Sequence, residues 1–139
     1  MKIRCLTVLL MWLCLMPAIA AADDSAEKAA ASAAQSWLGQ IDAGSYGKSW
    51  NDASVYFQGA VTEKGWIDAL NGSRKPLGKL LSRKLGKAQN VKSLPGAPDG
   101  SYVVMQYDTN FSNKKSAVET VTFVQEKDGK WKAAGYYIK

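Results

Sequence analysis

The sequence contains no histidine, and its two cysteines are Cys5 and Cys14. Both cysteines lie within the first 22 residues, which we predict to be removed as a signal peptide. The mature chain then has no thiolate for a disulfide or a metal ion, and no imidazole for a catalytic triad. The sequence therefore excludes thiol catalysis and histidine-based sites, and we expect neither a metal nor a cofactor.

Residues 1–22 have the three parts of a signal peptide. Lys2 and Arg4 form a positively charged start, residues 5–16 are apolar apart from Thr7, and small residues dominate 17–22. The apolar run is shorter than the roughly 20 residues that span a bilayer. We expect cleavage after residue 20 or 22. The absence of disulfides fits the bacterial periplasm better than a small secreted eukaryotic domain, so we predict a periplasmic protein.

Acidic side chains are missing from residues 74–92, where basic side chains gather. The basic residues there are Arg74, Lys75, Lys79, Arg83, Lys84, Lys87 and Lys92. One interpretation is an edge strand whose lysines prevent aggregation. The other is a surface for an anionic envelope component or an acidic protein. No aromatic residue in this segment could stack on a base, so we expect no nucleic acid partner.

Residues 23–139 suffice for one domain and not for two. Apolar residues at three- and four-residue spacing predict helices over 23–43 and 46–57 and a third one that begins at Thr62 and ends near Gly72. Downstream of Pro76, segments rich in β-branched and aromatic residues alternate with short turn sequences. They predict strands over 79–92, 100–111, 117–126 and 130–139.

Helices followed by sequential strands predict an α+β fold, with about three N-terminal helices packed on a curved four-stranded antiparallel sheet. The segment 79–92 is ambiguous, because its leucines recur every four residues and also permit an amphipathic helix. Gly78 and Gly86 each disfavour a helix by about 1 kcal/mol relative to alanine. We therefore favour a strand, with a bulge near one of the two glycines.

Two carboxylates and several aromatic residues are candidates for a functional pocket. In strict alternation, Glu119 shares a strand face with Val121 and Phe123, which would point it beneath the helices; Asp108 is a second candidate. A buried carboxylate beside a tyrosine could act in acid–base catalysis. Alternatively, Glu119 is solvated or pairs with a lysine or Arg74. The candidates for a ligand pocket, which could equally fill the core, are Trp66, Tyr102, Tyr107 and Trp131.

Several stretches together resemble an uncharacterised bacterial family, the domain of unknown function 4019. They are WLGQIDAGSYGKSW (37–50), LGKLLSR (77–83), LPGAPDGSYVVMQY (94–107), ETVTF (119–123) and GKWKAAGYYI (129–138). The resemblance implies an α+β fold similar to nuclear-transport-factor-2-like or cystatin-like domains, and it implies no activity. We predict a non-catalytic binding or interaction module. The alternatives are a small acid–base enzyme with a cone-shaped pocket and a subunit that forms a homodimer through its sheet.

Overall fold

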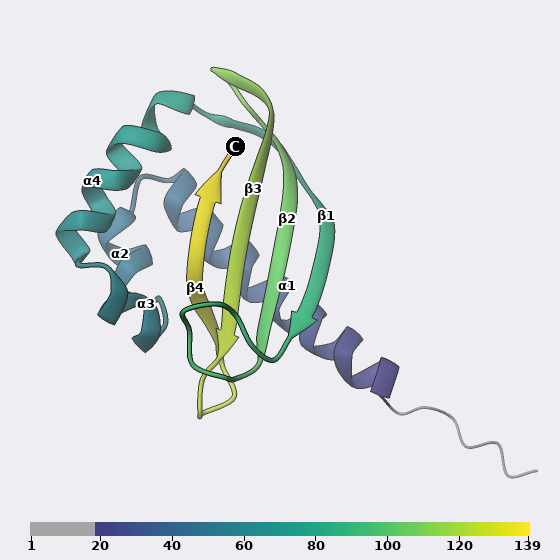
Figure 1. The fold of residues 1–139 in the computed structure, drawn as a ribbon. Helices are drawn as coiled ribbons and strands as arrows, with labels where there is room; N and C mark the ends of the chain where they lie inside the picture. The colour runs from purple at the N-terminus through teal and green to yellow at the C-terminus, as the bar shows by residue number, and fades with distance from the viewer. Residues whose placement is uncertain (1–18) are drawn as a thin grey trace, which may run out of the picture.

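Four α-helices precede a four-stranded antiparallel sheet in the computed structural model, which describes residues 19–139, with side chains from residue 24 (Figure 1). Residues 1–18 of the predicted signal peptide lie outside the described residues. The helices are α1 (Ile19–Asp42), α2 (Tyr46–Asn51), α3 (Val55–Ala60) and α4 (Glu63–Ser73), followed by a 3₁₀ turn, η1 (Lys75–Leu77). The strands are β1 (Leu80–Val91), β2 (Tyr102–Phe111), β3 (Lys114–Gln125) and β4 (Trp131–Ile138).

The first predicted helix is confirmed in α1. Its alanine-rich sequence favours a helix, and its buried face repeats at the expected spacing through Ala30, Ala34, Trp37, Leu38 and Ile41. Gly44 ends the helix in the left-handed conformation, with φ of 78°. The N–H of Gly44 then donates to the carbonyl of Ile41 at 3.0 Å, which is typical of a glycine that follows a helix.

The prediction of one helix over 46–57 is wrong, because the chain forms two short helices there. Ser54 adopts an extended conformation, and its hydroxyl accepts a hydrogen bond from the N–H of Phe57, so it caps α3. Its own N–H donates to the carbonyl of Ala133 on β4 at 2.8 Å. This contact with the sheet removes Ser54 from the helical path and raises the helix count above the expected three.

All four predicted strands are confirmed, and they pair in the order β1-β2-β3-β4 without closing the sheet. Residues 80–91 form a strand rather than a helix. The register of β1 shifts between Leu85 and Lys87, as the glycine between them suggested. A Cβ atom on Gly86 would lie 3.0 Å from a carboxylate oxygen of Asp108. The bulge therefore favours glycine for its lack of a side chain.

The helices lie on one side of the sheet (Figure 1). Helix α1 runs across that face, and α2, α3 and α4 gather beside β4. The core lies between α1 and the sheet, where Trp37 and Leu38 pack together with Val103, Met105 and Phe123. No helix within residues 19–139 is long and apolar enough to cross a membrane. This arrangement leaves the opposite face of the sheet without a helix from the described chain.

Candidate functional site

Four charged side chains meet inside the protein, and we call them the buried charge cluster. They are Asp42, Arg74, Arg83 and Glu119. Asp42 is the last residue of α1, and Arg74 caps the C-terminus of α4. Arg83 lies on β1 and Glu119 on β3. The cluster therefore joins two helices to an edge strand and a central strand.

Glu119 has no solvent exposure, and its carboxylate accepts four hydrogen bonds. Its Oε1 atom accepts from Arg83 Nε at 2.7 Å and from Thr109 Oγ1 at 2.7 Å. Its Oε2 atom accepts from Arg83 Nη2 at 3.1 Å and from Tyr136 Oη at 2.5 Å. A carboxylate offers about four acceptor positions. Glu119 is thus fully hydrogen-bonded by side chains of the protein itself.

Arg83 bridges Glu119 to a second carboxylate. Its Nη1 and Nη2 atoms donate to Asp42 at 2.7 and 3.0 Å, so it makes bidentate contacts with both partners. Burial alone would lower the pKa of Arg83, but hydrogen bonds to Asp42 and Glu119 raise that pKa above its ordinary value. The guanidinium therefore stays charged. With Arg74 as the second cation, the two positive and two negative charges balance.

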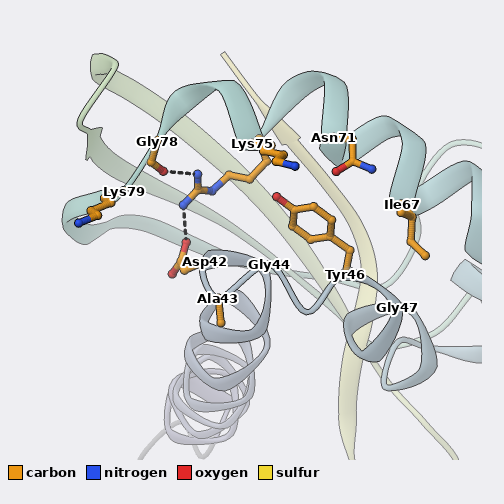
Figure 2. Close-up of a pocket in the computed structure, with 11 residues that line it drawn as sticks. Asp42, Ala43, Gly44, Tyr46, Gly47, Ile67, Asn71, Lys75, Gly78 and Lys79 are labelled. Atoms are coloured by element: carbon orange, nitrogen blue, oxygen red, sulfur yellow. Dashed lines mark hydrogen bonds and ion pairs between the residues drawn. The ribbon is translucent and has the colours of Figure 1, made fainter.

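Arg74 attaches the start of β1 to the end of α1. Its Nη2 atom donates to Asp42 at 3.1 Å and its Nη1 atom donates to the carbonyl of Gly78 at 2.7 Å (Figure 2). The guanidinium also lies over the ring of Phe111, with its carbon 4.3 Å from the centroid, in a cation–π contact. Asp42, Arg74 and Gly78 lie in the wall of a cleft of about 520 Å³ between the ends of α1 and α4.

Tyr107 and Tyr136, which interact with the charges of Glu119 and Arg83, remain protonated. Burial raises the pKa of Tyr136 above its ordinary value, and the charge of Glu119 raises it further. Burial likewise raises the pKa of Tyr107. Tyr136 therefore serves Glu119 as a hydrogen-bond donor. A base needs a free acceptor position within reach of its substrate, and this carboxylate has all of its positions occupied by Arg83, Thr109 and Tyr136.

The structure separates the two candidate carboxylates. Glu119 faces the helices, as the alternation of β3 indicated, but its charged partner is Arg83 rather than a lysine or Arg74. Asp108 is exposed and lies on the other face of the sheet, opposite Lys84 and Val118. No group of three potential metal ligands occurs within the described part of the chain. The catalytic role of either carboxylate stays a prediction.

The four aromatic residues considered for a ligand pocket do not line a common cavity. Trp66 is buried among the helices and packs edge-on against Phe57, with centroids 4.9 Å apart. Tyr107 lines a groove between α1 and β1. Tyr102 lies on the opposite face of the sheet, where its hydroxyl donates to the carbonyl of Pro98. Trp131 is half-buried at the start of β4, so these rings belong to different parts of the protein.

The seven basic residues of the segment 74–92 divide into two largely buried arginines and five exposed lysines. Arg74 is 3% exposed and the Arg83 side chain 12% exposed, because the two guanidinium groups neutralise buried carboxylates. The exposed members of the set are Lys75, Lys79, Lys84, Lys87 and Lys92. On β1, Lys84 lies opposite Asp108 and Lys87 lies opposite Gln106. The segment thus supplies both an internal ion network and an exposed surface.

The sequence did not single out Asp42 of the buried charge cluster, or Thr109 and Tyr136, which donate hydrogen bonds to Glu119. Thr109 lies on the buried face of β2, which alternation could have indicated. Tyr136 and Tyr137 are adjacent in β4, so only one can face the helices; Tyr136 does, and Tyr137 is 53% exposed. Asp42 gave no comparable signal, because a carboxylate at the end of a helix is usually exposed.

The comparisons with known proteins identify a family and no activity. No curated protein and no solved structure matches the chain. One family model, described as a protein of unknown function (DUF4019), matches residues 33–136. The match begins in α1 and ends in β4, and so contains all four members of the buried charge cluster. The chain therefore belongs to the DUF4019 family.

Proposed function

We propose that the protein is an exported, non-catalytic binding module that engages an anionic partner through its basic end. The basic end comprises four exposed lysines, Lys75, Lys79, Lys114 and Lys115. Figure 1 places the end of α4 and the turn between β2 and β3 at the same end of the molecule. Hydrogen bonds join the two segments, because the N–H of Ser112 donates to the carbonyl of Lys79 at 2.8 Å.

The distribution of charge carries this proposal. Residues 73–79 and 111–116, which form the basic end, contain no Asp or Glu. Removing residues 1–22 takes away two positive charges and no acid, which lowers the net charge from +6 to +4. The summed charge of the four lysines thus equals the net charge of the whole mature chain. The basic end will attract anions over about one Debye length, roughly 8 Å at physiological salt.

The geometry of the buried charge cluster favours binding over the acid–base alternative. The acceptor positions of Glu119 are filled by Arg83, Thr109 and Tyr136. Using it as a base would require breaking a charge-assisted hydrogen bond in the interior, where unpaired charge is costly. The cluster instead holds β1, and with it Lys79, in a fixed position against α1.

Neutralising the basic end should abolish retention on immobilised heparin, a soluble polyanion. The test protein replaces Lys75, Lys79, Lys114 and Lys115 with glutamine. The matched control, of equal net charge, replaces Lys28, Lys64, Lys127 and Lys130 with glutamine. At about 0.15 M salt, where charges more than roughly 8 Å apart are screened, we expect the control to be retained and the test protein to elute. Equal elution of the two would contradict the proposal.

We further propose a periplasmic location in a bacterium and a fold of the nuclear-transport-factor-2-like or cystatin-like kind. The sequence of residues 1–22 supports export, and helices gathered on one side of an antiparallel sheet support the fold. The buried side chains of α1 begin at Ala30, so cleavage after residue 20 or 22 would leave the core intact. A homodimer through the uncovered sheet face stays a prediction.

Export can be checked by the intact mass of the protein from a fractionated bacterial host. We expect the soluble periplasmic fraction to contain a chain that begins at Ala21 or Asp23. The control carries Leu9→Arg, which interrupts the apolar run and should keep the chain unprocessed in the cytoplasm. A wild-type chain that keeps its first 20 residues and sediments with the membranes would contradict the prediction.

A further inference from the structure

We propose that the anionic partner is a lipid bilayer and that Leu81 and Leu85 of β1 insert into it beside the basic end. This inference rests on the proposed function of the lysines and adds the class of partner. The observation behind it is an apolar edge beside a basic surface. A bilayer with anionic lipids presents negative charge and hydrocarbon together, so it matches both parts of this surface.

The two leucines are among the five exposed large apolar residues of the described chain. Leu81 is 63% exposed and Leu85 39% exposed. Both lie on β1, an edge strand of the sheet. Leu81 follows Lys79 of the basic end by two positions, whereas Lys84 lies on the other face of the sheet, opposite Asp108. Apolar and basic side chains therefore share one edge of the protein.

The leucines also line an open groove of about 770 Å³ between α1 and β1. Apart from Asp42, the α1 residues that line this groove are Ala31, Ser32 and Gln35, which are small or uncharged. The charges in its floor belong to Asp42 and Arg83, which neutralise each other. The approach of hydrocarbon to Leu81 and Leu85 would consequently desolvate no unpaired charge.

The form of the strand favours a bilayer over an acidic protein. A protein partner could add a strand to the free edge of β1. The register of β1 shifts between Leu80 and Ser82 and again between Leu85 and Lys87. Such bulges and edge lysines interrupt the pairing of a further strand. A bilayer needs no hydrogen-bond register, so the same bulges do not oppose its binding.

The absence of cysteine from residues 23–139 permits a direct test. A Leu81→Cys variant is labelled with an environment-sensitive NBD fluorophore, and Cys5 and Cys14 are changed to alanine in any chain that keeps them. Val55 is 75% exposed on α3, so Val55→Cys is the control. With phosphatidylglycerol vesicles, the fluorescence at position 81 should rise by about threefold and be quenched by lipids brominated on their acyl chains, as interfacial insertion implies. The fluorescence of the label at position 55 should neither rise nor be quenched.

A second measurement separates insertion from charge attraction. Replacing both Leu81 and Leu85 with alanine should weaken binding to phosphatidylglycerol vesicles roughly tenfold, since each buried methylene contributes to partitioning. The leucine replacements should not change retention on heparin. The control Val55→Ala should change neither vesicle binding nor heparin retention. Both leucines are exposed, so circular dichroism should show an unaltered fold.

The outcomes distinguish this inference from the proposal on which it rests. If heparin retains the wild type but the label at position 81 stays in water on phosphatidylglycerol vesicles, the partner is a soluble polyanion or an acidic protein and the inference is overturned. If neither heparin nor the vesicles bind the wild type, both the proposed function and this inference fail. If the fluorescence at position 81 rose equally on pure phosphatidylcholine vesicles, the inference would also be overturned, because the lysines would then contribute nothing to membrane binding.

Discussion

Replacing Arg83 with alanine is expected to lower the free energy of unfolding by about 3–5 kcal/mol, the range for breaking a buried ion pair by removing one partner. The substitution removes both hydrogen bonds of Asp42 to Arg83 and two of the four that reach Glu119. Glu119 is fully buried, so the lost donors leave acceptor positions of a carboxylate unfilled in the interior. Urea denaturation followed by circular dichroism measures the loss.

The neighbouring lysine provides the control. Lys84 is exposed on the same strand, and Lys84→Ala should change stability by less than about 0.5 kcal/mol, as for most surface substitutions. If Arg83→Ala were as stable as Lys84→Ala at neutral pH, the cluster would contribute no net stability.

Much of the fold was predictable because local signals and tertiary contacts agree. Turn sequences separate the strands, and the glycine at 86 marks the bulge in β1. The helix over 46–57 was mispredicted because a long-range contact decides its interruption. The N–H of Ser54 bonds to Ala133, which lies 79 positions later in the chain. Periodicity within a short window contains no information about such a partner.

The candidate site was less predictable for a related reason. Arg83 lies between Leu81 and Leu85 in a segment whose lysines are exposed, and composition alone made it one more surface charge. Its partners Asp42 and Glu119 are 41 and 36 positions away. Each of these residues is charged, and charged residues are usually exposed when considered one at a time. They are buried together because they neutralise one another.

The cluster also selects one register for β1. Leucines occur at several positions of the strand, so burial of apolar side chains specifies its register weakly. In the observed register Arg83 lies opposite Thr109 and faces the helices. A one-residue slip would turn it to the other face and leave Asp42 and Glu119 without their shared cation. The charges thus supply a specificity that the leucines of this strand lack.

Replacing Trp66 with alanine is expected to cost about 3–5 kcal/mol, the usual range for a large aromatic residue in a core. The Trp66 ring stacks on Trp37 with centroids 5.9 Å apart and packs edge-on against Phe57 and Tyr136. Its indole N–H donates to the hydroxyl of Ser49 at 2.9 Å. Because Trp66 is buried where α4 meets α1 and the sheet, its removal would leave a cavity lined by rings that cannot all collapse into it.

A conservative variant separates packing from hydrogen bonding. Trp66→Phe keeps most of the apolar volume and removes the donor to Ser49, whose own hydroxyl still donates to the carbonyl of Tyr46. It should therefore cost roughly 1–2 kcal/mol, the sum of a smaller packing loss and one neutral hydrogen bond. The order wild type, Trp66→Phe, Trp66→Ala in thermal midpoint tests the assignment. A midpoint for Trp66→Ala within about two degrees of wild type would show that Trp66 is not part of the core, because 1 kcal/mol shifts the midpoint of a domain this size by roughly 4 degrees.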